Sequence, residues 1–468
     1  MSKTLLKNLR IQNFKGWQDT GDIELAPITL FFGTNSSGKS SIGQFLMMLK
    51  QTVELSDRKM ILHTGNANSY VNLGSFRNII HRHDPKNELS FAYTWEPDAD
   101  EKISFGESEK TVESIRFECC VGTDQNDNRN FVPKLKEFTY ELSPADGTQK
   151  MQFSLQRNRQ SKFELQDDEK YFKKSAGRPW GTAATLHFCG VPKELWGYYQ
   201  NPEIFADINL QQEKLFSKFF YLGPLRQAPS YLYSWSGYEP EEVGKAGQDT
   251  IAALLAGSGR KYSSKSHPKS SKLLQVVIAK ALKDMGLIEE FKVGAISESH
   301  GQYEVRIRTK GSPEFVNLPD VGFGISQILP VITELYYVPS RSVIIIEQPE
   351  LHLHPKAQAA LADVMIDAVN ARESGHDRNI QLLIETHSEH FLRRFLRRLA
   401  EDENDQLLEQ FRAYFVDGST LPATLDPLKV NGYGEIANWP KDFFGDELGE
   451  ISAQMQAGIA KRMKEENR

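Results

Sequence analysis

Short apolar runs, each followed by a polar turn, recur along this chain. The run ITLFF at 28–32 leads into GTNSSGKSS, and the SIGQFLMML that follows has helical periodicity. A second run, VIIIE at 343–347, ends in an acidic turn, and a third, IQLLIE at 380–385, ends before the sequence THS. Apolar strands followed by helices predict an α/β fold with parallel strands.

The stretch between the first two of these runs has a different pattern. From 88 to 190, short apolar segments such as SIRFECCV alternate with polar segments such as TDQNDN, which predicts meandering strands. From 204 to 290 the pattern is more helical, with LLQVVIAKALKDMGL as a clear segment. No heptad repeat is sustained, so we expect no long coiled coil.

The composition is that of a soluble protein large enough for a full core. Of the 468 residues, 39% are hydrophobic and 25% charged, and no apolar run approaches the roughly 20 residues that a membrane helix needs. The N-terminus lacks the continuous apolar stretch of a signal peptide, so we expect a cytoplasmic protein without membrane contact. Three cysteines without metal-ligand spacing favour reduced thiols over disulfides or a zinc module. A net charge of −6 argues against a surface coated with basic residues for nucleic acid.

The turn after the first apolar run has the spacing of a phosphate-binding loop. Residues 33–40, GTNSSGKS, fit the pattern G-x-x-x-x-G-K-[ST] between a strand and a helix. The glycines let backbone N–H groups turn toward phosphates, Lys39 reaches the terminal phosphates, and the Ser40 hydroxyl ligates Mg²⁺. We therefore expect the chain to bind ATP and Mg²⁺. The nucleotide-binding residues expected in this loop are Gly33, Asn35, Gly38, Lys39, Ser40 and Ser41.

Two further motifs lie downstream of the long insert. Glu347, at the end of the second run, is the candidate Mg²⁺ carboxylate, and the insert accounts for its large separation from the phosphate-binding loop. Just before its strand, GFGISQ at 322–327 opens an apolar helix, and bare N–H groups at a helix N-terminus bind anions. The residues expected to contact phosphate from this glycine turn are Gly322, Gly324 and Ser326.

The order of phosphate-binding loop, long insert, glycine turn, acidic strand and histidine resembles that of the ABC-type ATPases of the SMC, Rad50 and OLD group. The resemblance makes residues 320–327 a signature-like segment that meets the γ-phosphate held by another subunit. It also makes Glu347 the Walker B acid and His387 the switch histidine that faces the γ-phosphate. From the residues alone, His387 could instead be a core histidine whose hydrogen bonds are satisfied.

Four segments look like a narrower group of these ATPases. They are YLGPLRQAP at 221–229, IEQPELHLHP at 346–355, IETHSEHFL at 384–392 and NWPKDFF at 438–444. They resemble compact ATPases with a DUF3696-type C-terminal segment, a group that includes ATPase subunits of bacterial anti-phage systems such as PtuA of Septu. The resemblance implies an ATPase that forms a homo-oligomer, a dimer or larger, through the signature-like turn and controls a separate effector, a nuclease. Nucleic acid would then be bound through the complex.

The resemblance also implies an ABC/SMC-type head formed by both ends of the chain around a large mixed β/α insertion. The expected parts are 1–95, the N-terminal part of the head; 96–302, an insertion that is strand-rich and then helical; 303–445, the C-terminal part of the head; and 446–468, a helical tail. The apolar residues of the tail share one helical face, so the tail either packs back on the core or docks a partner.

Gln348 follows Glu347 at the position where these ATPases normally have the glutamate that activates water. A neutral amide orients water but is a poor proton acceptor, so we expect tight ATP binding with slow hydrolysis. Glu350 and Glu385 are the nearby carboxylates that could replace the missing base. The catalytic residues expected are Gln348, Glu350, Glu385 and His387.

The alternative function is a DNA-repair or recombination ATPase of the RecF or Rad50 type that binds DNA directly. Segment 259–272, GRKYSSKSHPKSSK, has five Lys or Arg residues and no acid, which predicts a mobile loop that either contacts a phosphate backbone or is only solvated. The net charge favours the effector-controlling ATPase. His352 and His354 alternate with leucines, which favours a structural role over metal ligation.

Overall fold

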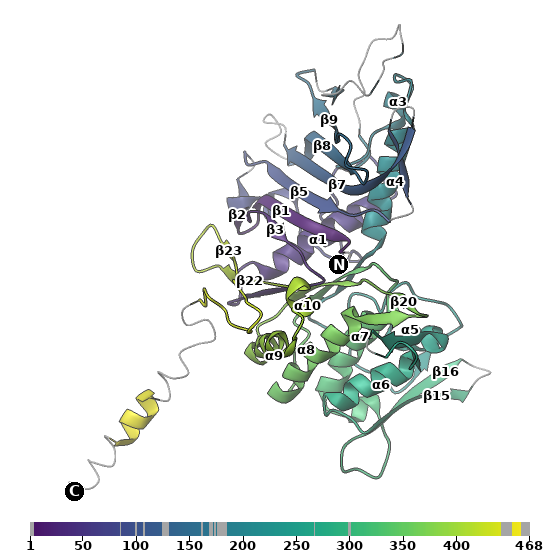
Figure 1. Cartoon of the computed structure of the whole chain (residues 1–468), viewed down its shortest axis with the longest axis vertical. Helices are drawn as coiled ribbons and strands as arrows, with labels where there is room; N and C mark the ends of the chain where they lie inside the picture. Colours follow the sequence, from purple (N-terminus) through teal and green to yellow (C-terminus); the bar gives the residue numbers. More distant parts are fainter. Residues whose placement is uncertain are drawn as a thin grey trace.

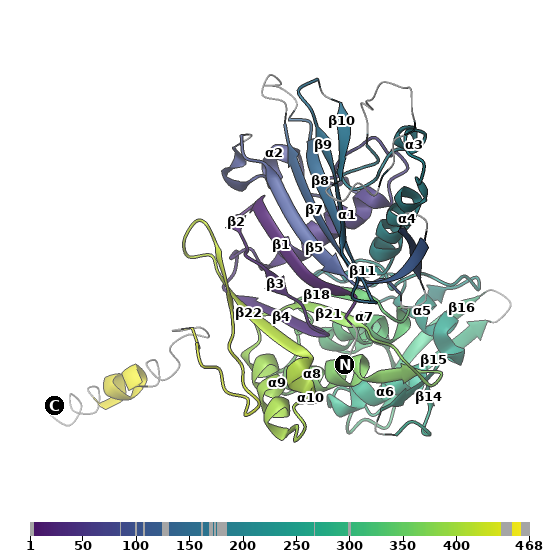
Figure 2. The same cartoon turned by 45° about the horizontal axis from the view of Figure 1, so that its top comes forward.

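The computed structural model of this chain is built on two large sheets, one parallel and one antiparallel (Figure 1). The residues that it describes are 4–84, 86–98, 101–105, 108–123, 131–160, 162–167, 172, 175, 185–265, 267–297, 301–440 and 452–459. Figure 2 shows the parallel sheet between the antiparallel sheet above it and the helices α7, α8 and α9 below it.

The parallel sheet has the strand order β11-β18-β21-β4-β22-β23. Its first five strands run parallel, and the edge strand β23 pairs antiparallel with β22. The bounds are β4, Ile28–Gly33; β11, Phe219–Leu222; β18, Val343–Glu347; β21, Gln381–Glu385; β22, Phe411–Asp417; and β23, Thr424–Pro427. β4 comes from the N-terminal part of the chain, and the other strands come from residues 219–427. Segments that are distant in sequence therefore build one sheet. The predicted α/β fold is confirmed.

The strands of this sheet are apolar without alternation because both of its faces are covered. On β4, Ile28, Leu30 and Phe32 belong to the core beneath the outer helices, whereas Phe31 belongs to the core on the opposite face. Successive side chains of a strand point to opposite faces, so a continuous apolar run fills two cores at once.

The antiparallel sheet has the order β10-β9-β8-β7-β5-β1-β2, and β3 and β6 pair with β1 and β7. Its bounds are β1, Leu6–Phe14; β2, Trp17–Asp19; β3, Ile23–Glu24; β5, Leu89–Trp95; β6, Lys102–Phe105; β7, Ser108–Gly122; β8, Lys134–Pro144; β9, Met151–Arg157; and β10, Phe163–Asp167. The meander predicted for 88–190 therefore extends a sheet that the N-terminal strand β1 begins.

Helix α1, Lys39–Val53, lies between the two sheets together with α4, Glu203–Ser217. The ring of Phe45 on α1 contacts Phe14 of β1 and Phe91 of β5, with centroids 5.2 and 5.1 Å apart. Ile345 and Leu383 of the parallel sheet belong to the same core. The helix that follows the phosphate-binding loop is thus covered by β-sheet on two sides.

The remaining larger helices cover the outer face of the parallel sheet. They are α5, Thr250–Ala256; α6, Leu274–Asp284; α7, Phe323–Tyr337; α8, Pro355–Val369; and α9, Glu389–Glu401. Shorter helices are α2, Phe76–Ile79; α3, Lys193–Trp196; α10, Gln406–Glu409; and the 3₁₀ turns η1, His81–His83, η2, Gly257–Gly259, and η4, Leu318–Asp320. No helix of the described residues exceeds 15 residues, so this part of the chain has no long coiled coil, as predicted. None is long and apolar enough to span a bilayer.

Two small sheets complete the fold. One contains β12, Tyr233–Ser234; β15, Glu290–Ser297; β16, Gln302–Arg308; and β17, Val316–Asn317. The other contains β13, Lys261–Ser264; β14, Lys272–Leu273; β19, Ala371–Glu373; and β20, His376–Asp377.

The prediction of a loop over the whole of 259–272 is wrong where β13 and β14 form, whereas residues 265 and 267–271 are exposed and lie outside helices and strands. β13 pairs with both β14 and β19, and the buried Tyr262 donates a hydrogen bond to the carbonyl of Tyr336 at 2.8 Å. Arg260 donates to the carbonyl of Tyr337 at 2.6 Å. Strand pairing, Tyr262 and Arg260 together attach residues 260–264 to the core.

In the tail, residues 452–459 are helical. Met455 and Ile459 are 66% and 59% exposed, so these two apolar side chains do not pack on the core. Leu448, Ile451 and Met463, which share their predicted face, lie outside the described residues.

Candidate functional site

Three strand ends meet at one edge of the parallel sheet. β4, β21 and β18 are neighbours and run parallel, so the segments after them leave the sheet on the same side. Glu385 lies beside Phe31 on one neighbouring strand and beside Glu347 on the other. The sheet therefore brings the phosphate-binding loop, Glu347 and Glu385 together, although they are far apart in sequence.

The phosphate-binding loop connects β4 to α1. Gly33 has a φ of 153°, and a Cβ there would lie 2.2 Å from the carbonyl oxygen of Val416 on β22, so only glycine fits this close approach. Gly38 has a φ of 103° and directly precedes the first residue of α1. Asn35 is exposed at the tip of the loop. The loop thus has the conformation for which its glycines were predicted.

The Lys39 side chain is buried and folds back over this loop. Its Nζ donates to the carbonyl oxygens of Gly33 at 3.0 Å and Thr34 at 2.6 Å. Burial lowers the pKa of Lys39, and the charges of Glu385 and Glu350 partly oppose that effect. The loop carbonyls are neutral, so phosphate oxygens would be stronger, charge-assisted partners for this ammonium group.

Ser40 and Ser41 have different surroundings. Ser40 lines the same small cavity as Glu347 and Glu385, and its hydroxyl is close enough to the Glu385 carboxylate to oppose the rise in the pKa of Glu385. The Ser41 hydroxyl donates to the carbonyl of Gly38 and accepts a hydrogen bond from the Trp17 indole at 2.7 Å. Ser41 therefore fixes the start of α1 against Trp17, in addition to the nucleotide contact predicted for it.

Helix α1 sits close enough to the sheet to fix the position of Glu347. A Cβ added at Gly43 would lie 2.8 Å from Cγ2 of Ile345, two residues before Glu347 on β18. The absence of a side chain at Gly43 lets the helix approach the strand at this point.

Glu347 is buried at the end of β18. The hydroxyl of Tyr221, on the adjacent strand β11, donates to its Oε1 at 2.8 Å. Burial raises the pKa of Glu347 to about 7, and the charge of Glu385 adds to this increase. A divalent cation at this edge would favour the ionised carboxylate.

Glu350 and Glu385 are also buried, and burial raises the pKa of each. Oε1 of Glu350 accepts the backbone N–H of His387 at 2.8 Å. Among the described residues, Oε2 of Glu350 and Oε2 of Glu385 are buried without a hydrogen-bond partner. Unpartnered buried oxygens are costly, so this edge is suited to an added cation or water.

His387 is half-buried and lies near the backbone of Gly33 in the phosphate-binding loop, which partly opposes the fall in the pKa of this histidine. Burial lowers the pKa of this histidine, and the charge of Lys39 lowers it further. His387 is therefore placed at the phosphate-binding loop in a neutral form that can donate one hydrogen bond.

Gln348 lies in a left-handed turn directly after Glu347, with a φ of 46°. Its N–H donates to the carbonyl of Glu385 at 2.8 Å, and its carbonyl accepts the N–H of Leu351 at 3.2 Å. Left-handed backbone is uncommon for residues other than glycine. The backbone contacts of this turn must therefore stabilise it.

The signature-like segment lies apart from the phosphate-binding loop of its own chain. Gly322 caps α7, and the Ser326 hydroxyl donates to the carbonyl of Phe323 at 2.8 Å. A Cβ at Gly324 would lie 3.0 Å from the carbonyl oxygen of His352, in the turn after Glu347. None of these contacts joins the segment to the phosphate-binding loop in the described part of the chain, and the close approach of Gly324 is to the turn that carries Gln348 and Glu350.

The two histidines after the acidic turn have structural contacts. Nδ1 of His354 accepts the backbone N–H of Lys356 at 3.3 Å and caps α8. The ring of His352 packs near Phe323, with centroids 6.2 Å apart. Among the residues that the structure describes, no group of three or more His, Cys, Asp or Glu could hold a metal ion.

Motif reasoning missed four residues of this edge, namely Lys15, Trp17, Tyr221 and Arg226. Lys15 lies near enough to Glu347 for the two charges to influence each other. Tyr221 and Arg226 belong to YLGPLRQAP, and the resemblance of that segment to the narrower ATPase group is the one signal that could have indicated them. Lys15 and Trp17 fit no motif.

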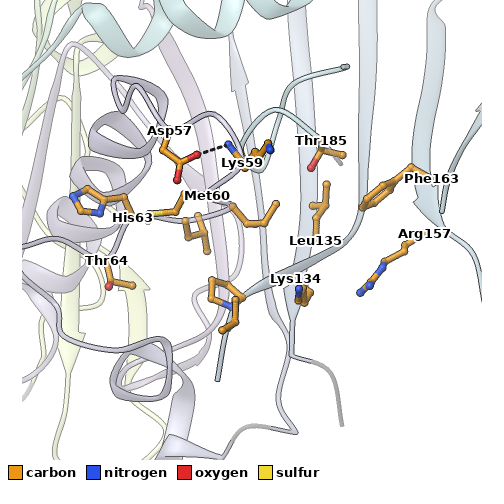
Figure 3. Close-up of a pocket in the computed structure, with 14 residues that line it drawn as sticks. Asp57, Lys59, Met60, His63, Thr64, Lys134, Leu135, Arg157, Phe163 and Thr185 are labelled. Atoms are coloured by element: carbon orange, nitrogen blue, oxygen red, sulfur yellow. Dashed lines mark hydrogen bonds between the residues drawn. The ribbon is translucent and has the colours of Figure 1, made fainter. Parts of the chain in front are cut away.

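Two cavities differ in their relation to this edge. A small one of about 20 Å³ lies beneath the start of α1 and is lined by Lys39, Ser40, Glu347, Glu385 and apolar residues. A larger one of about 490 Å³ lies between the segment after α1 and strands β8 to β10, where Lys134 and Arg157 line it (Figure 3). None of the predicted site residues lines the larger cavity. It is separate from the ends of β4, β21 and β18, which we call the nucleotide edge.

The residues present at the strand ends suit a nucleotide with Mg²⁺. Proteins commonly hold Mg²⁺ through one or two side chains, with substrate phosphates and water as the other ligands. Ser40 and Glu347 offer a hydroxyl and a carboxylate. Glu385, which has an unpartnered oxygen, lines the same small cavity. The loop carbonyls that Lys39 would release when it binds a phosphate are neutral.

Two models of AAA-type domains match the chain in its two halves. An AAA ATPase domain model matches residues 5–177, and an AAA domain model whose description names the AbiEii toxin and a type IV TA system matches residues 229–393. The matches include the phosphate-binding loop, the glycine turn, Glu347 and His387. No curated protein matches this chain.

The similar solved structures include SMC head domains at low identity. The Smc head bound to the C-winged helix domain of ScpA has a TM-score of 0.39 and 10% identity, over 91% of this chain and 98% of its own. The SMC head domain from Thermotoga maritima has the same TM-score and identity, over 91% and 100%. The Smc head domain from Pyrococcus furiosus, bound to the C-terminal domain of ScpA, has a TM-score of 0.36 and 8% identity, over 91% and 96%. These scores describe a distant likeness only.

Proposed function

We propose that this chain, an ATPase of the AAA and SMC-like kind, binds Mg²⁺–ATP at the edge of its parallel sheet and acts as a slowly hydrolysing switch. The nucleotide controls self-assembly of the chain and, through it, a separate effector. The observation that supports this proposal best is the meeting of Lys39, Ser40, Glu347 and Glu385 at three adjacent strand ends.

Each of these side chains has a task that its position allows. Lys39 exchanges the carbonyls of Gly33 and Thr34 for oxygens of the terminal phosphates. Ser40 and Glu347 would hold Mg²⁺, which neutralises phosphate charge when bound. Tyr221 fixes the Glu347 carboxylate through its hydroxyl.

Hydrolysis is slow in this proposal because Gln348 can orient the attacking water but cannot accept its proton. Glu350 and Glu385 have raised pKa values and unpartnered oxygens, so either could take that proton less directly. His387 donates a hydrogen bond near the γ-phosphate. Turnover then depends on positioning and charge more than on a dedicated base.

Assembly takes place through the signature-like segment. Phe323, beside Gly322, is 68% exposed, and Leu225, beside the acidic turn, is 82% exposed. Exposed large apolar side chains around a candidate contact are typical of an interaction surface. A second copy of the chain placed here would bring its glycine turn to the nucleotide.

The role of this switch in anti-phage defence, with a nuclease as effector, rests on the resemblance to the DUF3696-type ATPases and to PtuA of Septu. The description of one matching model, which names a toxin of a TA system, agrees with a defence role. Direct DNA binding receives less support, since Arg394 and Arg398 of α9 are both paired with Asp363.

Light scattering of the purified chain with ATP, ADP or no nucleotide tests the switch. We expect ATP with Mg²⁺ to induce a homo-oligomer and turnover to stay below about 1 per second. Gly324→Arg should abolish assembly but leave ATP binding unchanged, since a bulky cation obstructs the interface. Gly294→Arg, at an exposed position of β15, is the matched control, because a Cβ there meets nothing within 4 Å. Equal assembly of wild type and Gly324→Arg would remove the glycine turn from the site.

A further inference from the structure

Arg226 lies beside the turn that contains Glu347 and Gln348, although no motif places it there. Its guanidinium is buried, and Nη2 donates to the carbonyl oxygen of Glu347 at 3.0 Å. Nη1 donates to the carbonyl oxygen of Gln348 at 3.4 Å. One side chain thus contacts two successive peptide groups of the acidic turn.

The backbone that carries Arg226 is fixed on both sides. Gly223 donates its N–H to the carbonyl of Lys245 at 2.9 Å, and Gln227 donates to the carbonyl of Ala246 at 2.8 Å. Tyr221, on the strand just before, holds the carboxylate of Glu347. The segment from Tyr221 to Arg226 therefore holds both the side chain and the main chain of Glu347.

The turn at Gln348 needs such support. Strained backbone persists only where the surroundings determine it, and it is concentrated at functional sites. The carbonyl of Gln348 accepts from Arg226 and from the N–H of Leu351, while its own N–H is bonded to the carbonyl of Glu385. Without the guanidinium, the peptide groups of Glu347 and Gln348 would lose their contact with the segment that follows β11.

We propose that Arg226 is a positioning residue for ATP hydrolysis, which fixes the Glu347–Gln348 turn so that the carboxylate meets the metal and the amide meets the attacking water. This inference rests on the proposed function, and it adds a residue that acts through the main chain of the turn. It also gives a reason for the arginine in YLGPLRQAP, a segment outside the nucleotide-binding motifs.

Arg378 provides a matched control for a test of this proposal. Its guanidinium is fully buried and also donates to two carbonyls, those of Leu335 and Val338, each at 2.6 Å. Nε of Arg226 is buried without a hydrogen-bond partner among the described residues, whereas Nε of Arg378 lies 3.5 Å from Oε2 of Glu373 in an ion pair. Arg378 holds the C-terminal end of α7, away from the strand ends of the nucleotide edge. The same substitution therefore removes the same kind of fork at two different places.

The experiment compares Arg226→Lys with Arg378→Lys in the full chain. Lysine keeps the charge but loses the planar fork that reaches two carbonyls. We measure kcat and KM for ATP, ADP affinity in EDTA, the Mg²⁺ concentration for half-maximal ATP binding, and thermal unfolding. Arg226→Lys should lower kcat roughly ten- to hundredfold, as small misplacements of reacting groups do. KM at saturating Mg²⁺ and ADP affinity in EDTA should remain within about twofold, because uniform binding is kept.

Arg378→Lys should change kcat less than about twofold, even where both variants lose similar thermal stability. A decrease of kcat in Arg226→Lys no larger than that in Arg378→Lys would overturn the proposal and leave Arg226 as a structural residue. If a lysine variant does not fold, Arg226→Gln and Arg378→Gln repeat the comparison, because glutamine can still donate to one carbonyl.

Failure of the proposed function gives a different result. A wild-type chain that binds no ATP refutes the proposed function, and with it the premise for Arg226. If the wild-type chain binds ATP without measurable turnover, the Mg²⁺ dependence of ATP binding decides whether Arg226 has the positioning role. In that case Arg226→Lys should raise the half-maximal Mg²⁺ concentration at least about tenfold relative to Arg378→Lys. An unchanged Mg²⁺ dependence would then overturn the positioning role.

Discussion

Two pairs of carboxyl groups lie near opposite ends of helix α1, and they differ in their surroundings; Glu347, Glu385 and Glu334 are buried and Glu242 is half-buried. Glu347 and Glu385 are neighbours near Lys39, its first residue. Glu242 and Glu334 are neighbours near Lys50, in its last turn. Burial is the largest cause of the raised pKa in both pairs, which reaches about 7 for Glu347 and for Glu242.

Both pairs contain a buried carboxylate oxygen without a hydrogen-bond partner among the described residues, Oε2 of Glu385 in the first pair and Oε1 of Glu334 in the second, so the pairs differ in their cations and in the space beside them. Among the described residues, Lys39 donates to neutral groups of the loop, the carbonyls of Gly33 and Thr34 and the Ser37 hydroxyl, and the first pair borders a small cavity. Lys50 instead pairs with Glu54 at 2.8 Å, and fully buried Glu334 accepts the N–H of Val243 at 3.0 Å. A raised carboxyl pKa therefore does not identify a functional site by itself. The nearby phosphate-binding backbone distinguishes the first pair from the second.

Replacing the lysine beside each pair should give the largest difference. Lys39→Ala should lower ATP affinity more than about 100-fold, because each lost charged hydrogen bond to phosphate is worth about 1.5–3 kcal/mol. Lys50→Met should leave ATP affinity intact and lower the free energy of unfolding, since it leaves buried carboxyl groups without their cation. Equilibrium dialysis and urea unfolding measure the two effects. Unchanged ATP affinity in Lys39→Ala would remove the site assignment.

Adding a carboxylate beside the first pair should increase turnover. Gln348→Glu supplies the missing proton acceptor, and general-base catalysis contributes about 10²–10⁴-fold where the geometry is preserved. Single-turnover hydrolysis measures the change. The slow-switch interpretation is wrong if wild-type turnover is rapid, indifferent to Gln348, and lost in Glu350→Gln or Glu385→Gln. That result would also identify the replacement carboxylate.

Replacing one glutamate of each pair by glutamine should show that only the first pair takes part in metal binding. Glu347→Gln should weaken Mg²⁺-dependent ATP binding by roughly 10–100-fold, the range known for changes at metal sites. Glu334→Gln keeps the shape of the side chain, so we expect ATP binding like that of wild type. Titration of Mg²⁺ at fixed ATP compares the two variants. Equal loss in both would contradict the difference drawn between the pairs.

The second pair should make stability depend on pH. A carboxyl whose pKa is higher in the folded state than in the unfolded state keeps its proton while the unfolded chain loses it, so stability falls as pH rises. For Glu242 this window runs from its ordinary value of 4.5 to about 7, with a slope of about 1.4 kcal/mol per pH unit. Glu54 and Glu241 act in the same direction on this group, and Lys50 opposes them.

Urea unfolding at pH 5 and pH 7.5 measures this dependence. We expect Glu334→Gln to be more stable than wild type at pH 7.5 and the advantage to shrink at pH 5. Other titrating groups contribute equally to both proteins, so the difference between them isolates the pair. An advantage that is independent of pH would show that the pair does not share a raised pKa.

The nucleotide edge could be predicted from sequence to the extent that its parts are local. A strand, a glycine-rich turn and a helix follow one another at 28–53. The apolar runs that end at Glu347 and Glu385 can each be recognised as strands from their own residues. The order of motifs then indicated which strand ends belong together. The glycines of the loop have the conformations that the motif predicts.

Other features depend on contacts that sequence patterns do not record. β11 comes from within 96–302 yet forms an edge of the parallel sheet, and this pairing alone brings Tyr221 and Arg226 to Glu347. Likewise, β1 pairs with β5, which joins the N-terminus to the meander. Strand pairing is decided by the whole core, so these neighbours are invisible in local periodicity.

The position of α1 between two sheets has a consequence for how the molecule can be divided. Phe45 contacts rings of β1 and β5, and Phe91 in turn contacts Phe117 and Phe188 of the following segment. Excising 96–302 would uncover this aromatic core and also remove β11 from the parallel sheet. The nucleotide edge is therefore not an autonomous folding unit: a shortened ATPase core should aggregate, and truncation is tolerated only where the removed backbone is exposed.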